Sequence, residues 1–164
     1  MAVRLSWQLS AAQWAVLTDA LFPHDLGPVT YPAPIQVQSS GRTDVEWGRV
    51  RAEVSAQLVR LGLFRAGRMD ADLEAALHLL HRPVCWVDSV WYPGSPTGQP
   101  VRMVAAAHST AGVAALQHPD EPGATLLEAI PARGLAAAVV GKLPAHPPGQ
   151  CPGAAVPLGR PVGR

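Results

Sequence analysis

Two histidines and a cysteine lie close together in the sequence, at His78, His81 and Cys85. Imidazole nitrogens and thiolate sulfurs are the usual ligands of zinc, so a metal site is the first chemistry to consider. Structural zinc sites take closely spaced pairs of ligands, and no second pair follows here. Pro83 also ends the predicted helix between the histidines and the cysteine. The sequence therefore predicts two histidines at a helix end, a cysteine in a strand, and no metal or cofactor.

Cys85 is also a candidate nucleophile, because Asp88 and His108 lie on the same predicted hairpin. In the simplest register Cys85 is opposite His108, but Asp88 points to the other face of the sheet. No nucleophile elbow or cysteine-protease motif surrounds these residues. The stretch GSPTG at 94–98 lacks the lysine and the helix of a phosphate-binding loop. We therefore expect this protein not to be an enzyme.

A group of arginines suggests a different class, a small regulatory or nucleic-acid-binding domain. Acidic residues are interleaved with them, and the net charge of the chain is only +1. A mixed-charge face of this kind is more typical of a solvated helix surface. Nucleic-acid binding is therefore the alternative function, and it would rest on Arg49, Arg51, Arg60, Arg65 and Arg68.

The elements that position these residues follow from hydrophobic periodicity and helix-capping signals. Ser10 and Thr43 have capping-box spacing to Gln13 and Glu46. Trp47 begins the apolar stripe of the second helix, so we expect it to be a core residue. The predicted order is one strand, three helices, a four-strand meander and a last helix. The ranges are 3–9, 10–22, 43–61, 70–82, 84–92, 101–108, 112–118, 124–130 and 131–143.

This order predicts an α+β domain over residues 1–143, with an antiparallel sheet and the helices packed on one face. The connection at 23–42 has four prolines, and its stretch IQVQ could add a short edge strand. Residues 144–164 contain many prolines and glycines and are predicted to form a disordered tail or linker.

The composition is that of a globular protein, with 48% hydrophobic and 15% charged residues. No stretch approaches the roughly 18 apolar residues of a membrane-spanning helix, and the N-terminal segment lacks a signal-peptide pattern. The cysteines at 85 and 151 form no disulfide framework, so we expect reduced thiols and a cytoplasmic location.

The segments, in this order, resemble the N-terminal half of the EspG family, the ESX (type VII) secretion-associated chaperones of actinobacteria. The resemblance covers about residues 5–150 and rests on LSAAQWAVLTDAL, LVRLGLFRAGRMDADLEAALHLLHRP, VCWVDSVWYPGSPTGQPVRMVAAAHSTAGVAAL and LLEAIPARGLAAAVVGKLP. It implies a non-enzymatic chaperone that binds a helical PE–PPE-type substrate, without nucleic acid or membrane insertion. It also implies an α+β fold of two similar halves around a central sheet, so this chain would be truncated before its second half.

The predicted partner-binding surface is the end of the hairpin formed by strands 84–92 and 101–108. The simplest register places Trp91 opposite Arg102 on a mixed face of the sheet, as a cation–π pair. That face is either a partner surface, since aromatic and arginine side chains are typical hot spots, or is covered by the tail or a loop. The predicted binding residues are Trp91, Tyr92, Pro93, Gly94, Ser95, Pro96, Thr97, Gly98, Gln99, Arg102 and Val104.

Overall fold

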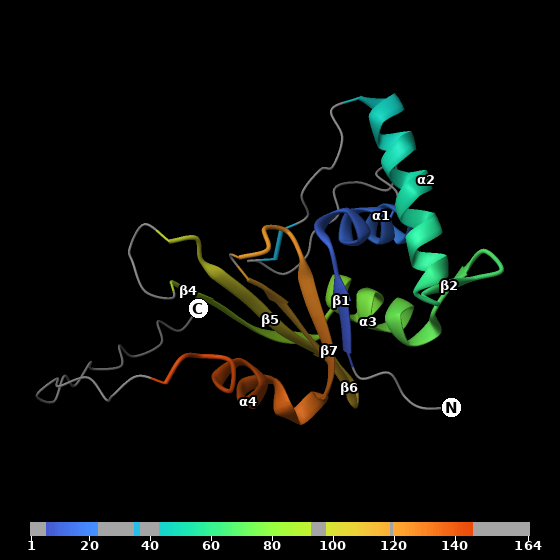
Figure 1. The fold of residues 1–164 in the computed structure, drawn as a ribbon. Coiled ribbons are helices and arrows are strands. Elements are labelled where there is room, and N and C mark those ends of the chain that lie inside the picture. Colours follow the sequence, from blue (N-terminus) through green and yellow to red (C-terminus); the bar gives the residue numbers. More distant parts are fainter. Residues whose placement is uncertain (1–5, 23–34, 37–42, 93–97, 119, 146–164) are drawn as a thin grey trace, which may run out of the picture.

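The computed structural model confirms the predicted α+β class, with one five-stranded antiparallel sheet and four α-helices (Figure 1). It describes residues 6–22, 35–36, 43–92, 98–118 and 120–145, so the predicted tail lies mostly outside the described residues. None of the helices in these ranges is long and apolar enough to cross a membrane. The elements are β1 (Ser6–Leu9), α1 (Ala11–Leu21), α2 (Asp44–Arg60), β2 (Phe64–Arg65), β3 (Arg68–Met69), α3 (Ala71–His81), β4 (Cys85–Trp91), β5 (Val101–His108), β6 (Ala111–Gln117), β7 (Thr125–Pro131), the 3₁₀ turn η2 (Ala132–Gly134) and α4 (Leu135–Val140).

The sheet has the strand order β1-β7-β6-β5-β4. Strands β4 to β7 form the predicted meander, and the N-terminal strand β1 pairs with β7. The two edges of the sheet are therefore β1, with four residues, and β4, with seven. Every pairing between neighbouring strands is antiparallel.

The helices cover both faces of the sheet, so the prediction that they pack on one face was wrong. Helices α1 and α3 lie on one face, with α2 packed beside α1, while α4 lies alone on the other (Figure 1). We call these the α1–α3 face and the α4 face. The reason is visible in β5, where six of the eight residues are buried, in a continuous run from Met103 to Ala107 with Val101 before it. A strand that is apolar in consecutive positions needs cover on both sides.

The two faces have separate cores. The larger core, on the α1–α3 face, includes Trp7, Leu9, Trp14, Leu17, Val54, Leu58, Leu73, Leu77, Leu80, Val104, Ala106, Val113, Ala115 and Leu127. The smaller core, under α4, consists of Met103, Ala105, Ala114 and Val139, with Trp91, Leu116, Ile130 and Leu135 packed around it.

The beginning of α1 is fixed by the capping box that the sequence predicted. The Ser10 hydroxyl accepts a hydrogen bond from the Gln13 backbone N–H at 3.2 Å, and the Gln13 side chain accepts one from the Ser10 N–H at 3.0 Å. Thr43 caps α2 through the Glu46 N–H, and Asp70 caps α3 in the same way. Each cap satisfies a backbone donor that the helix itself leaves unpaired.

Ser10→Ala is expected to lower the free energy of unfolding by about 1 kcal/mol, because it removes one half of this capping box. Urea denaturation followed by far-UV circular dichroism measures the change. Ser6→Ala is the matched control, since Ser6 is exposed in an edge strand. Equal losses in the two variants would show that the cap does not stabilise α1.

The apolar stripe of α2 is only partly in the core. Val54 and Leu58 are buried, Trp47 and Val50 are half-buried, and Leu61 is 50% exposed. Arg51 lies over the Trp47 ring, 5.7 Å from its centroid. The prediction that Trp47 is a core residue was therefore too strong, because this end of α2 projects beyond the sheet (Figure 1).

A small hairpin, β2–β3, occupies the turn that the sequence predicted between α2 and α3. Its central residues Ala66 and Gly67 have φ angles of 50° and 76°, the left-handed conformation that a two-residue hairpin turn requires. Leu63 is buried, and its carbonyl accepts a hydrogen bond from Asp70 at 2.8 Å. The hairpin thus positions the N-cap of α3 directly after α2.

Candidate partner-binding surface

Of the predicted binding residues that the structure describes, all but Val104 lie where β4 ends and β5 begins. Residues 93–97 of the prediction lie outside the described residues. Of the others, Gly98 and Gln99 are exposed, and Tyr92 is 57% exposed. We call residues 91–92 and 98–102 the hairpin end. It offers an exposed aromatic ring, but not the pairing that the sequence predicted.

Trp91 and Arg102 do not form a pair, because the predicted register was wrong by one residue. Trp91 is opposite Val101, and Arg102 is opposite Val90. Since side chains alternate along a strand, this shift places Trp91 on the α4 face and Arg102 on the α1–α3 face. Trp91 is half-buried and packs against the smaller core.

The structure changes two other predictions. Val104 is fully buried in the larger core, so its side chain cannot contact a partner. Cys85 is opposite Ala107, which puts Cys85 and His108 on opposite faces and separates the proposed thiol–imidazole pair.

Arg102 lines a hollow of about 280 Å³ at the hairpin end. Within the described residues, no carboxylate forms an ion pair with its half-buried guanidinium. A guanidinium among neutral polar groups is suited to a carboxylate, which it can hold through two parallel hydrogen bonds. The other lining residues are Gln36, Gln99, Pro100, Gln117, His118, Pro122 and Gly123.

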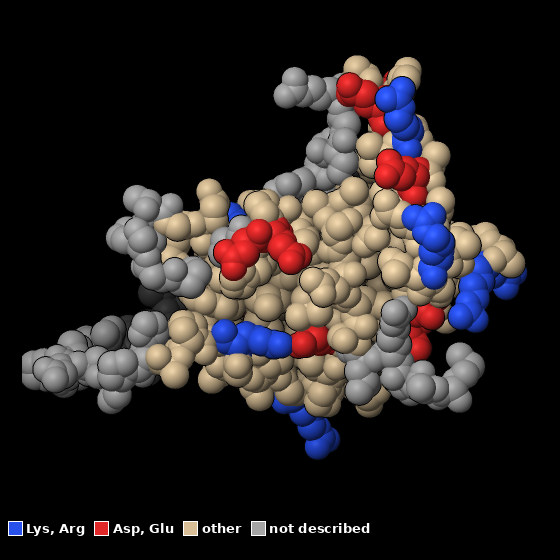
Figure 2. All heavy atoms as spheres, in the orientation of Figure 1, with Lys and Arg blue, Asp and Glu red and all other residues tan. Residues whose placement is uncertain are grey.

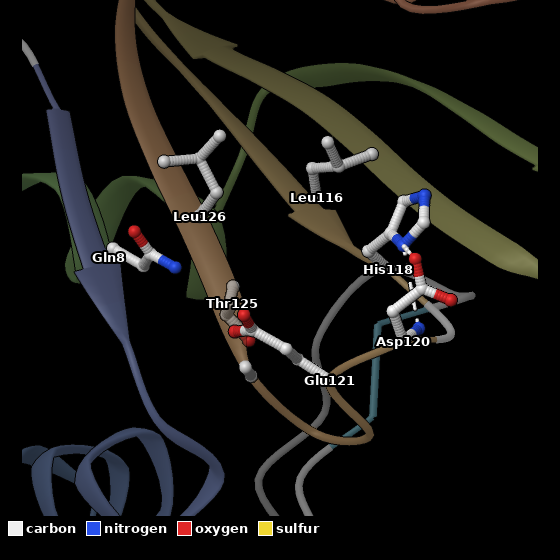
Figure 3. Close-up of a pocket in the computed structure, with 8 residues that line it drawn as sticks. Gln8, Leu116, His118, Asp120, Glu121, Thr125 and Leu126 are labelled. Carbon is white, nitrogen blue, oxygen red and sulfur yellow. Dashed lines mark hydrogen bonds and ion pairs between the residues drawn. The ribbon is translucent and has the colours of Figure 1, made fainter.

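A second hollow, of about 260 Å³, lies at the same end of the sheet but on the α4 face (Figure 3). Leu116 and Leu126 point to the same side and form its apolar part, with Gln8 of β1 next to Leu126. Asp120 and Glu121 add negative charge on the connection between β6 and β7. We call this the Leu116 hollow and the first one the Arg102 hollow.

The two hollows lie on either side of the connection at 118–124, and His118 lines both. The imidazole Nδ1 of His118 is 3.2 Å from a carboxylate oxygen of Asp120. The sequence prediction missed the residues of this connection. The signal was present as HPDEPG at 118–123, a proline-containing turn that places a histidine and two acids directly after a strand.

The histidines considered for zinc serve in packing around Phe22. The ring of His81 is 4.0 Å from the Phe22 ring centroid in a tilted arrangement, and His78 meets Phe22 edge-on at 5.2 Å. Cys85 is exposed on β4. No group of three histidine, cysteine or acidic side chains in the described part of the chain could hold a metal ion.

The arginines of the nucleic-acid alternative do not form a basic patch in the view of Figure 2, where basic and acidic side chains alternate along α2. Arg51 forms an ion pair with Asp19 of α1. A surface with both signs of charge does not concentrate the positive potential that nucleic-acid backbones require.

Comparison with known proteins points to a single family. The family model of the EspG family matches residues 20–162, which is most of the chain and includes every described helix and strand from α2 onward. No curated protein matches the chain. The α+β fold with an antiparallel sheet is the fold that the resemblance implied. This chain belongs to the EspG family, the type VII secretion-associated chaperones.

Proposed function

We propose that this protein is a cytoplasmic, non-enzymatic chaperone of an actinobacterium that binds a helical PE–PPE-type secretion substrate at the hairpin end. The observation that carries the proposal is the pair of hollows on either side of the connection at 118–124. One contains a guanidinium that forms no ion pair among the described residues, and the other combines two leucines with acidic residues. Membership of a family of secretion chaperones supplies the class of partner.

The chemistry of the hollows suits the side chains of a helix tip. The Arg102 hollow fits an acidic side chain, because a carboxylate there would replace solvent around a half-buried cation. The Leu116 hollow fits an apolar side chain with a basic neighbour, because Leu116 and Leu126 lie next to Asp120 and Glu121. The two hollows lie on opposite faces of the sheet at the same end, so a helix tip that lies across the connection at 118–124 would place one side chain in each.

Nucleic acid is not part of the proposal. The net charge of +1 and the alternating charges along α2 provide no strong field for a polyanion. Retention of the protein on DNA, lost as salt is added, would favour the alternative instead.

Arg102→Ala is expected to weaken substrate binding about tenfold, which corresponds to about 1.4 kcal/mol. Isothermal titration calorimetry with a purified PE–PPE heterodimer measures the change. Tyr92→Ala should act in the same direction, because Tyr92 is exposed and its truncation leaves the core intact. Trp91 is a poorer probe, since it packs under α4.

Arg133→Ala is the matched control for the loss of positive charge. Arg133 is exposed and follows β7 at the opposite end of the sheet from the hairpin end. Equal weakening by Arg133→Ala and Arg102→Ala would show that general charge, not the hairpin end, determines binding. Failure of the unmodified chain to bind any PE–PPE substrate would contradict the proposed function itself.

A further inference from the structure

Strand β4 is an open edge of the sheet. It is the last strand in the order β1-β7-β6-β5-β4, and among the described residues it pairs only with β5. The backbone N–H and C=O groups on its outer side are therefore available to another strand. The edge runs over seven residues, which is long for an unprotected edge.

The side chains along this edge are unusually apolar. Five of the ten large apolar side chains that the described residues expose fall between residues 84 and 92. Trp86 and Val90 lie on the α1–α3 face, and Val87 lies on the α4 face, so both faces of the edge are apolar. The five residues are Val84, Trp86, Val87, Val90 and Tyr92.

The usual protection of an edge strand is nearly absent from β4. Soluble proteins place lysine, proline or a bulge in such strands to prevent association. Residues 84–92 contain no lysine, arginine or proline, and the register with β5 is continuous. Asp88 is the single charge. The other edge, β1, has only four residues, and these alternate between exposed and buried.

The helices cover this apolar strip only in part. On the α1–α3 face, α3 packs over β5 and β6, and Trp86 is left 51% exposed. On the α4 face, α4 packs on β4 and β5, yet Val140 and Leu143 at its end are exposed as well. The apolar surface thus continues from the strand onto the end of α4, as expected for a protein interface.

We infer that β4 is the interface between two copies of this chain, which pair edge to edge and join their five-stranded sheets into one. Antiparallel pairing about a two-fold axis brings the same patch of both copies together. In an antiparallel pair, residues directly opposite each other point to the same face of the sheet, whereas neighbours in one strand point to opposite faces. The two-fold axis therefore passes at one residue of β4, which lies opposite its own copy. The strand can pair with its own copy if Asp88, its only charged residue, does not lie on the axis opposite the Asp88 of the other copy.

The side chains of β4 favour a pairing centred on Ser89. Centring on Asp88 would place two carboxylates opposite each other, which is destabilising. Centring on Ser89 instead brings Asp88 opposite Val90, Val87 opposite Trp91, and Trp86 opposite Tyr92. The last of these is an aromatic pair across the strands, a stabilising combination. A centre at Val87 would lose that pair and bring Trp86 opposite Asp88.

Sedimentation velocity on the full chain, from about 1 to about 100 μM, tests for the dimer over the range of weak to standard interfaces. We expect a concentration-dependent dimer that Val87→Lys weakens at least about tenfold, because a charge enters the apolar edge. The control is Val59→Lys, which adds the same charge at an exposed valine on α2 and should leave the dimer unchanged. A chain that stays monomeric throughout this range overturns the inference.

Cysteine cross-linking tests the register without relying on a destabilising variant. In a Cys85→Ser, Cys151→Ser background, Ser89→Cys should form a covalent dimer under mild oxidation, because the two copies of residue 89 meet at the axis. Val45→Cys, exposed on α2, should not.

A dimer that forms no cross-link at residue 89, or that persists in Val87→Lys, contradicts this interface. An extended segment of another protein would then be the occupant of the edge. Neither measurement uses a secretion substrate, so failure of the dimer leaves the proposed function untouched.

Discussion

Replacing Trp14 with alanine is expected to lower the free energy of unfolding by about 3–5 kcal/mol. Trp14 lies near the beginning of α1, is 0% exposed, and belongs to the larger core. Among the described residues, it is the largest side chain that is fully buried, and its removal leaves a cavity that the packed core cannot close without moving. The loss is a large part of the 5–15 kcal/mol that stabilises a typical domain.

Urea denaturation gives the loss in the free energy of unfolding for Trp14→Ala and for Trp47→Ala. The difference between the two losses distinguishes the effect of core packing from the effect of removing any indole ring. Trp47 is half-buried at the projecting end of α2, so we expect its truncation to cost about 1 kcal/mol. Equal m-values would show that both variants unfold from a comparable native state. A loss in Trp47→Ala as large as that in Trp14→Ala would mean that α2 packs more deeply than the structure shows.

The contrast between these two tryptophans shows what helical periodicity predicts. The spacing of apolar residues identified the buried side of α1 and of α2, and Val54 and Leu58 on that side are in the core. It did not indicate how far α2 extends past the elements that cover it. That depends on where α1 and the sheet end in space, which is a property of the tertiary structure.

The sheet shows the same division between local and long-range information. Period-two alternation and turn residues predicted the strands of the meander and their order. The register of β4 and β5 was missed because nine residues separate the strands, and a connection of that length does not fix a register as a two-residue turn does. The position of α4 could have been predicted, because the consecutive apolar residues of β5 indicate burial on both sides.

The candidate site could be predicted only in its location. The hairpin end was identified from Trp91, Arg102 and the long connection between them, although Trp91 packs against the smaller core. The hollows were not, because they combine residues from strands far apart in the sequence, such as Gln8 with Leu126, or Gln36 with Arg102. Contacts between such distant segments depend on the topology of the sheet, which places β1 beside β7.

Gln117 illustrates a long-range contact with a large expected effect. It is 5% exposed, and its amide is fully used. Its Nε2 donates to the Gln36 carbonyl at 2.7 Å and to the Thr125 hydroxyl at 3.1 Å, while its Oε1 accepts from the Gln36 N–H at 3.0 Å. The side chain thus binds the backbone of Gln36 much as a neighbouring strand would, and this holds Ile35 in the core. The sequence analysis suggested a short strand at IQVQ, residues 35–38. Its first two residues are not in a strand and instead bind the side chain of Gln117.

Gln117→Leu is expected to lower the free energy of unfolding by about 2–4 kcal/mol, because it keeps the volume but removes three hydrogen bonds and leaves buried polar groups unpaired. Native-state hydrogen exchange should also show the Gln36 amide losing protection, since its acceptor is gone. Gln99→Leu is the control, because Gln99 is exposed and its replacement should change stability by less than about 0.5 kcal/mol. If Gln117→Leu leaves the exchange of the Gln36 amide unchanged, then Gln117 does not hold this segment to the sheet. The Arg102 hollow, which Gln36 and Gln117 line, would then be shaped by other contacts.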